Sequence, residues 1–321
     1  MTISKSRLVN CCAALLCLSA IYSGIAAAEE KTTQSVRPPC LYYSVDFANA
    51  NTGWIVGEGG VIVKTTDGGR TWINQNSGTT NNLLSVQFVT VNDGWAVGAK
   101  GTILRTKDGG KTWTPQSSGA SKQLDSMRFV NLNIGWAAGD DGTVLKTYDG
   151  GITWKPQNAG RTDFHACWFL NSKVGWAAGN NLAIQKTSDG GETWINQSSG
   201  EKKDRLWSIY FINASSGWTV GWNGVILSTT DGGATWKPQS SGTPRPLYCI
   251  RFVNPDTGWA VGQAGTIMKT TDGGTTWNPQ SSGTPDTLQS VDFINATTGW
   301  AVGKNSTTIK TVNGGKTWKS L

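Results

Sequence analysis

Short segments with alternating apolar and polar side chains recur along the chain, each bounded by turn-forming residues. Within residues 83–118, an alternating segment at 84–88 precedes an Asn-Asp-Gly turn, and a second, apolar segment follows at 95–98. A Lys-Gly turn then leads to a third segment at 102–106, and Trp113 begins a fourth. A period of two with such short connections is typical of antiparallel strands joined by hairpins. The pattern predicts one unit of four short strands, which we designate A to D.

The unit is repeated seven times, because the dipeptide Gly-Trp recurs every 40 to 42 residues. Each copy continues into the turn sequence Asp-Gly-Gly-x-Thr-Trp, with Asn313 in place of Asp in the seventh, and these two motifs hold 14 of the 17 tryptophans. Repeats of this length with four strands each form the blades of β-propellers. We therefore predict an all-β fold, a seven-bladed β-propeller of four-stranded antiparallel blades, over residues 41–321. A solenoid is the alternative, but neither end of the chain resembles a polar capping repeat.

The Asp-Gly-Gly turn has a structural explanation. Its carboxylate can accept backbone N–H groups within the C–D hairpin, its glycines allow positive φ, and its tryptophan can cover the space between sheets. We predict a structural role, not a chemical one, for the first residues of the seven turns: Asp67, Asp108, Asp149, Asp189, Asp231, Asp272 and Asn313.

These turns resemble the Asp-box, or BNR repeat, of sialidases and sortilin-type receptors. The fuller unit, from Phe252 through Gly258-Trp259 to the turn at Asp272, is most similar to the photosystem II stability/assembly factor-like family. The resemblance covers residues 41–321. It implies a non-catalytic extracytoplasmic propeller that binds protein partners, such as a membrane-complex subunit, during assembly of the complex.

The first 28 residues are predicted to be a signal peptide. Lys5 and Arg7 precede a mostly apolar stretch at 8–25, and Ala26-Ala27-Ala28 supplies the small residues required for cleavage before Glu29. An uncleaved membrane anchor is the alternative. After cleavage we expect no membrane span, and a periplasmic or secreted protein (in the thylakoid lumen if the organism is photosynthetic). Residues 29–40 form an N-terminal segment that can add a closing strand.

The residue inventory argues against most kinds of catalysis. His165 is the one histidine, and neither a Gly-x-Ser-x-Gly motif, nor a phosphate loop, nor a metal-type CxxC pair occurs. We therefore expect no cofactor and no metal. Cys40, Cys167 and Cys249 remain after signal cleavage, either as three free thiols or as one disulfide and one thiol. The charge of +7 is not clustered, which argues against a nucleic-acid partner.

Candidate binding residues come from strand A and from the variable connections. In antiparallel blades the A–B and C–D turns share one end, where the sequence is monotonous, and the B–C and D–A connections share the other, where it varies. The slot before the last apolar residue of strand A also varies and faces the axis if this strand lines a channel. We predict a partner site at the variable end, across blades 3 to 6. Its residues are Arg128, Trp168, Tyr210, Arg251, Lys202, Lys203, Arg205 and Trp207.

Two other interpretations of these side chains remain open. The variable loops can reflect drift, and the strand-A slot can line a water-filled channel with locally paired charges. A third pattern, basic residues on strand C, favours a structural role in which each cation packs along a neighbouring tryptophan. These residues are Lys64, Arg105, Lys146, Lys186, Lys269 and Lys310, with Ser228 as the exception.

The favoured function is therefore a monomeric scaffold that binds a protein partner. Glycan binding by Trp168, Trp207 or Trp222 is the non-enzymatic alternative. A sialidase-like glycosidase is the enzymatic alternative, because Arg128, Arg251, Tyr210 and Asp46 occupy comparable strand-A slots. Its usual motif before the first blade is only weakly echoed by residues 36–39, and sialidases have six blades.

Overall fold

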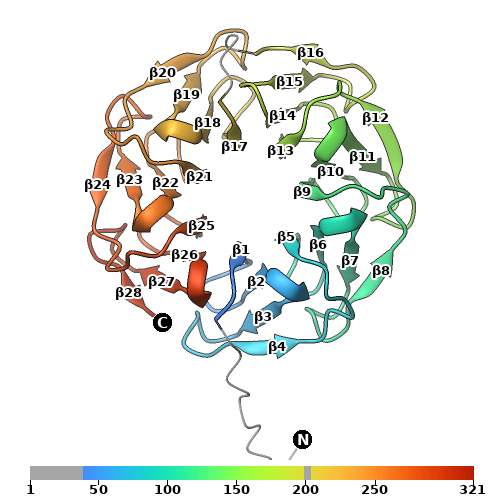
Figure 1. The fold of residues 1–321 in the computed structure, drawn as a ribbon, viewed down its shortest axis with the longest axis horizontal. Helices are drawn as coiled ribbons and strands as arrows, with labels where there is room; N and C mark the ends of the chain where they lie inside the picture. Colours follow the sequence, from blue (N-terminus) through green and yellow to red (C-terminus); the bar gives the residue numbers. More distant parts are fainter. Residues whose placement is uncertain (1–38, 199–203) are drawn as a thin grey trace, which may run out of the picture. The chain divides into compact units, whose positions relative to one another are not determined.

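The computed structural model describes residues 39–198 and 204–321, and residues 42–320 form seven four-stranded antiparallel sheets arranged around a central axis (Figure 1). The strands of blades 1 to 3 are β1 (Tyr42–Phe47), β2 (Gly53–Gly57), β3 (Ile62–Thr65), β4 (Ile73–Gln75), β5 (Leu83–Phe88), β6 (Gly94–Gly98), β7 (Ile103–Thr106), β8 (Thr114–Gln116), β9 (Leu124–Phe129), β10 (Gly135–Gly139), β11 (Thr143–Thr147) and β12 (Lys155–Asn158). Those of blades 4 to 7 are β13 (Phe164–Phe169), β14 (Gly175–Gly179), β15 (Ile184–Thr187), β16 (Ile195–Asn196), β17 (Leu206–Phe211), β18 (Gly217–Gly221), β19 (Ile226–Thr229), β20 (Lys237–Gln239), β21 (Leu247–Phe252), β22 (Gly258–Gly262), β23 (Ile267–Thr270), β24 (Asn278–Gln280), β25 (Leu288–Phe293), β26 (Gly299–Gly303), β27 (Thr308–Thr311) and β28 (Lys319–Ser320).

Every sheet uses four consecutive strands in the order A, B, C, D, so the predicted fold is confirmed. The A strands line the axis, and the D strands form the outer rim (Figure 1). The outer strands are shorter than expected: β8 begins at Thr114, after Trp113, because Trp113 packs inward against Phe88. Most B–C turns form short 3-10 segments, of which η4 (Trp222–Gly224) is one.

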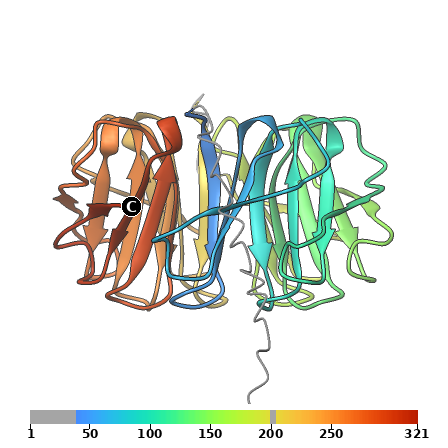
Figure 2. The ribbon, with the colours of Figure 1, turned by 90° about the horizontal axis from the view of Figure 1, so that it is seen from below.

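The connections gather at the two ends of the ring (Figure 2). At one end the C–D turn meets the A–B turn, since Gly68 N–H donates to the Asn51 carbonyl at 2.8 Å. At the other end the B–C turn meets the D–A connection, since Glu58 N–H donates to the Leu41 carbonyl at 2.9 Å. We call these the aspartate-turn end and the B–C end.

Neighbouring blades are joined by one repeated aromatic contact. The Trp54 ring stacks on Phe88 of the next blade at 3.4 Å between centroids, and its Nε1 donates to the Gly109 carbonyl at 3.1 Å. The same stack occurs at all seven interfaces, with centroid separations from 3.4 to 3.8 Å. The glycine of the Gly-Trp motif makes room for it: a Cβ at Gly94 would lie 2.6 Å from the Phe88 ring.

The two tryptophans of each repeat are not buried equally. Trp54 and its counterparts on strand B are 0 to 3% exposed. Those of the Asp-Gly-Gly turn contact the phenylalanine edge-on, and Trp72, Trp154, Trp194 and Trp236 are only half-buried. The strand-B tryptophan therefore provides the larger share of the apolar surface between blades.

The ring closes between blade 7 and blade 1 through the same contact as elsewhere. Trp300 stacks on Phe47 at 3.6 Å and donates to the Gly68 carbonyl at 3.0 Å. The fourth strand of blade 7 is β28, from the end of the chain. The predicted signal peptide and the expected closing strand at 31–36 lie outside the described residues. In the part of the chain that the structure describes, no helix is long and apolar enough to span a bilayer.

Candidate functional site

The aspartate turns make the local contacts that the sequence predicted. Asp108 Oδ1 accepts the Thr112 N–H at 2.9 Å and the Thr106 hydroxyl at 2.8 Å, and Oδ2 accepts the Thr112 hydroxyl at 2.6 Å. The hydrogen bonds from the Thr112 hydroxyl and N–H favour the carboxylate and lower the pKa of Asp108 to about 2. These side chains are engaged within their own turns and hold the hairpin closed.

The strand-C cations pack against the tryptophans of strand B. Lys64 Nζ lies 5.2 Å from the Trp54 ring centroid, and five other blades show the same geometry. Lys269 Nζ also donates to the Gly314 carbonyl at 2.8 Å. Where the cation is replaced by Ser228, Gln239 Nε2 donates to its hydroxyl at 2.8 Å. The pattern is structural, as the sequence indicated.

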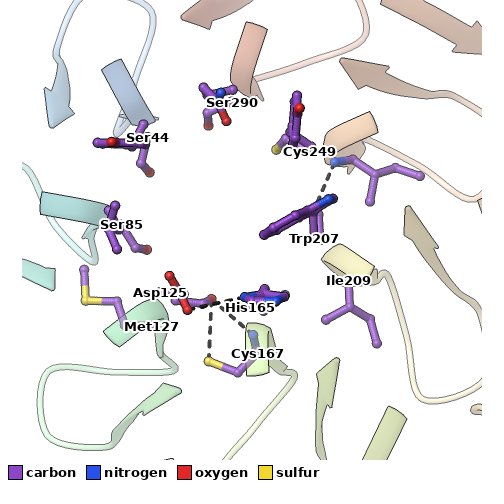
Figure 3. Close-up of a pocket in the computed structure, with 18 of the residues that line it drawn as sticks. Ser44, Ser85, Asp125, Met127, His165, Cys167, Trp207, Ile209, Cys249 and Ser290 are labelled. Atoms are coloured by element: carbon purple, nitrogen blue, oxygen red, sulfur yellow. Dashed lines mark hydrogen bonds and ion pairs between the residues drawn. The ribbon is translucent and has the colours of Figure 1, made fainter. Parts of the chain in front are cut away.

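The remaining candidate site is the channel along the axis, lined by the inner strands of all seven blades. Its middle layer is made of the third residues of these strands, four of which are serines whose Oγ accepts an N–H of the next blade, as Ser126 does from Cys167 at 3.1 Å. Figure 3 looks into this cavity, with Ser44, Ser85 and Ser290 on its wall. Cys40, Cys167 and Cys249 are all free thiols. No cluster of three potential metal ligands occurs among the described residues.

Arginines and aromatic rings gather at one mouth of this channel. The Arg128 guanidinium carbon lies 3.8 Å from the Trp168 ring centroid, and Trp168 contacts Tyr210 at 4.4 Å between centroids. The Arg251 guanidinium lies 5.6 Å from both rings. We call this group the arginine mouth. It consists of the fifth residues of the inner strands: Asp46, Gln87, Arg128, Trp168, Tyr210, Arg251 and Asp292.

The two arginines of this mouth are held differently. Arg251 Nη2 forms an ion pair with Asp292 Oδ1 at 3.0 Å, and Asp292 Oδ2 accepts the Phe47 N–H at 2.8 Å. Arg128 donates to the Phe169 carbonyl at 3.4 Å and, among the described residues, forms no ion pair. Burial and the charge of Arg251 lower the pKa of Arg128 to about 10, which still leaves it cationic.

A second acidic group faces the same mouth. Asp46 Oδ2 accepts the Phe88 N–H at 2.8 Å. Burial and the nearby charge of Asp292 raise the pKa of Asp46 to about 7, since both disfavour its ionised form. Asp46 therefore changes its charge near neutral pH, beside the two arginines of this mouth.

The structure corrects the predicted location of the arginines. Arg128, Trp168, Tyr210 and Arg251 do form one contiguous group, but they lie at the aspartate-turn end, where the cavity is also lined by Asn254 and other A–B turn residues. Strand A runs from the D–A connection to the A–B turn, so its fifth residue lies near the latter. Trp207, at the second position of β17, and Arg205 lie at the B–C end instead, about 10 Å further along the strand direction. Lys202 and Lys203 lie outside the described residues.

The opposite mouth is a feature that the sequence interpretation missed. It consists of the second residues of the inner strands and is called here the aromatic mouth: Tyr43, Leu84, Asp125, His165, Trp207, Tyr248 and Gln289. His165 Nδ1 lies 3.4 Å from Asp125 Oδ2, and its Nε2 lies 2.9 Å from Asn180 Oδ1. Figure 3 shows Asp125 beside His165, and Trp207 extending into the opening. The sequence did contain an indication of this mouth, because the second position of strand A varies between repeats as much as the fifth position does.

Comparison with known proteins identifies the repeat. The model of a family described as photosynthesis system II assembly factor YCF48 matches residues 74–156, 119–202, 162–244 and 239–321. These overlapping matches cover most of the chain. Among curated protein sequences, none matches this chain.

Several solved structures share the fold. YCF48 bound to D1 peptide superposes with a TM-score of 0.72 at 20% identity, covering 86% of this chain and 94% of that one. YCF48 from Cyanidioschyzon merolae gives 0.71 at 20% identity, covering 86% and 97%. The GH74 xyloglucanase from Xanthomonas campestris gives 0.72 at 11% identity, covering 88% of this chain and 54% of that enzyme. Identities this low establish a common fold and nothing more.

Proposed function

This chain belongs to the family of the photosynthesis system II assembly factor YCF48, and from that premise we propose that it is a non-catalytic propeller that binds a segment of a protein partner. The partner class is a subunit of a membrane complex, by analogy with the solved structure of YCF48 bound to D1 peptide. The site that we assign to this partner is the arginine mouth, at the aspartate-turn end of the channel.

The observation that carries the proposal is that Arg128 has a guanidinium without an ion pair among the described residues. Its guanidinium is stacked on Trp168 at 3.8 Å and held in the channel wall, yet it forms no ion pair among the described residues. A guanidinium has five N–H donors, and the Phe169 carbonyl accepts from its Nε alone. The free edge is suited to a carboxylate, which arginine binds in a planar, bidentate geometry.

The surroundings favour a peptide carboxylate over a small anion. Trp168 and Tyr210 add two aromatic faces, and arginine with aromatic residues dominates the energetics of protein interfaces. The cavity beside them has a volume of about 560 Å³ and is bordered by the A–B turns of blades 6 and 7. We assign an acidic side chain, or a free C-terminal carboxylate, of the partner to Arg128, with the flanking residues of the partner over these turns.

The arrangement gives little support to a sialidase-like reaction. That chemistry pairs a tyrosine nucleophile with a glutamate, and the described lining around Tyr210 contains no glutamate. Arg251 is already committed to Asp292 at 3.0 Å. We therefore propose binding and not hydrolysis. The proposed location is extracytoplasmic, supported by the predicted signal peptide at residues 1–28 and by the family resemblance.

The test is capture of the partner from membranes of the source organism by the mature protein, residues 29–321, with identification by mass spectrometry. Arg128→Ala is expected to reduce recovery of membrane-complex subunits at least tenfold, because it removes the unpaired guanidinium. Arg70→Ala is the matched control, since Arg70 is exposed at the same end but lies outside the channel.

Arg251 is unsuitable for this experiment, because removing it leaves Asp292 buried without its cation. Equal recovery by wild type and Arg128→Ala would remove the arginine mouth as the site. Loss of recovery in both Arg128→Ala and Arg70→Ala would instead indicate binding by overall charge.

A further inference from the structure

The aromatic mouth borders a cavity of about 320 Å³ at the B–C end of the channel, a size within the usual range for small-ligand sites. It is bounded by the rings of Tyr43, Trp207 and Tyr248 on three different blades. Trp207 approaches Tyr248 at 6.0 Å between centroids, and its other neighbours are His165, at 4.4 Å between centroids, and the Arg205 guanidinium carbon, at 5.9 Å from the ring centroid. Aromatic rings therefore form part of the cavity wall, with polar side chains between them.

The charged groups that line this cavity compensate each other. Asp125 Oδ1 accepts Gln123 Nε2 at 2.7 Å, and Asp125 Oδ2 faces His165 at 3.4 Å. Burial alone would lower the pKa of His165, but the hydrogen bonds to Asp125 and Asn180 outweigh it and raise the pKa. The carboxylate of Asp125 and the ring of His165 therefore satisfy each other. No arginine or lysine is among the described residues that line this cavity, and Arg205, which packs over the Trp207 ring, lies outside that lining.

Neutral hydrogen-bonding groups of this cavity are uncommitted. Trp207 Nε1 is buried without a hydrogen-bond partner among the described residues. The part-exposed hydroxyls of Tyr43 and Tyr248 and the amide of Gln289 make no hydrogen bond within the described part of the chain. A buried donor without a partner costs free energy that a ligand acceptor can recover. These groups include both donors and acceptors, and they alternate with flat apolar faces.

We propose that the aromatic mouth is a binding site for a neutral saccharide. A sugar ring offers an apolar C–H face to an aromatic ring and a belt of hydroxyls that both donate and accept, which matches this lining. Trp207 provides the stacking surface and an indole N–H, while Tyr43, Tyr248 and Gln289 bind the hydroxyls. The one carboxylate of the lining is already engaged by His165 and Gln123, and the lining holds no arginine or lysine, so it offers no unpaired charge to a charged ligand.

The structure also selects among the tryptophans that the sequence offered for glycan binding. Trp168 is stacked by Arg128 at 3.8 Å and contacts Tyr210 at 4.4 Å, so neither neighbour leaves it a free platform. Trp222 is 44% exposed on η4 but does not line the cavity. Of the three, Trp207 is the one that lines the cavity at the B–C end, beside the polar groups of Tyr43, Tyr248 and Gln289.

The first experiment applies the mature protein to a glycan array that holds neutral and acidic saccharides, followed by calorimetric titration of the best-retained glycan. We expect retention of neutral glycans and at least tenfold weaker binding by Trp207→Ala. Trp222→Ala, a matched loss of one tryptophan at the same end, is expected to bind as the wild type does. Arg128→Ala should also bind normally, which separates this site from the proposed protein site.

A second variant guards against misfolding of Trp207→Ala. Gln289→Ala combined with Tyr248→Phe removes hydrogen-bonding groups and keeps the aromatic wall, and it should weaken binding while the melting temperature stays close to that of wild type. The proposal is overturned if no neutral glycan is retained, if acidic glycans alone are retained, or if Trp207→Ala binds as well as wild type. Specific binding of a Lys- or Arg-containing peptide at Trp207, without saccharide binding, would also overturn it.

Discussion

Two parts of the propeller differ in how strictly they repeat from blade to blade. One is the packing between neighbouring blades, called here the frame, and the other is the set of side chains that line the channel, called here the wall. In the frame, each strand-B tryptophan meets a phenylalanine of the next blade, and this pair is identical at seven interfaces. In the wall, the fifth position of strand A holds Asp, Gln, Arg, Trp or Tyr. The two aspartates and the glutamine accept the N–H of a phenylalanine of the next blade, whereas the arginines and Trp168 contact the next blade in other ways. The frame repeats because every interface must have the same geometry for the ring to close. The wall can vary because its side chains border open space.

The blade that lacks the strand-C cation refines this comparison. Beside Ser228, Trp218 still stacks on Phe252 at 3.6 Å and still donates to the Gly273 carbonyl at 2.9 Å. The aromatic stack and its glycine carbonyl therefore form without a cation above them. Within the frame, the tryptophan is the essential part and the cation is an addition.

The largest expected effect is on the frame. Trp136 is fully buried, stacks on Phe169 at 3.7 Å and donates to the Gly190 carbonyl at 3.0 Å. Trp136→Ala should therefore lower the free energy of unfolding by about 3–5 kcal/mol, through a cavity and an unpaired carbonyl. Denaturant titration measures the change. A loss below about 1 kcal/mol would show that single interfaces do not limit the stability of the ring.

A smaller effect is expected at the aspartate turns. Asp108→Ala should cost roughly 1–3 kcal/mol, because the Thr112 N–H and two hydroxyls lose their acceptor. Asp108→Asn should cost less, because in the seventh turn Asn313 Oδ1 accepts the Thr317 N–H at 3.0 Å and its Nδ2 donates to the Thr317 hydroxyl at 2.9 Å. Thermal unfolding of both variants tests the order, and partner capture by the folded Asp108→Ala should match wild type.

The pH dependence of the aspartate turns has a defined sign. The folded-state pKa of Asp108 is about 2, below its usual value near 3.8. Its contribution to stability is therefore present above about pH 4 and is lost as the pH falls towards 2. Asp108→Asn should lack this loss, so the difference in melting temperature between wild type and Asp108→Asn should narrow over that range.

The smallest effect is expected in the wall, and it has the opposite sign. Burial and Asp292 raise the pKa of Asp46 from its usual value near 3.8 to about 7, so ionisation of Asp46 costs more in the folded state. Stability from this residue is complete below about pH 4 and declines as the pH rises towards 7. Asp46→Asn keeps an acceptor for the Phe88 N–H and should raise the melting temperature by roughly 2–4 °C at pH 8, with little change at pH 4. If Asp46→Asn instead lowers the melting temperature at pH 8, the ionised Asp46 stabilises the packing between blades.

The sequence was sufficient for the frame because its contacts are encoded in every copy. Gly-Trp, Asp-Gly-Gly and the alternation of strand A each predict a local structure, and seven copies in register predict the ring. The packing of Lys64 on Trp54 was also predictable, since the cation and the tryptophan recur at a constant spacing.

The wall was only partly predictable. Alternation along strand A indicated that Arg128 and Trp168 share a surface, and this was confirmed. It did not indicate which end of the channel they reach, because that depends on the position along a strand that spans about 20 Å. The pair of Asp125 and His165 was missed, although both occupy the second position of strand A in adjacent blades and that position varies between repeats.

The closure of the ring has a consequence for the order in which contacts form. Adjacent blades are joined across 42 residues, as between Phe88 and Asp46, whereas the contact from Phe47 to Asp292 spans 245. The entropy of closing the longer loop is less favourable by about 1.5 kcal/mol. We therefore expect the interface between blades 7 and 1 to form last during folding. This seam uses the same tryptophan and phenylalanine contact as the other six, and it differs from them in the length of chain that must be brought together.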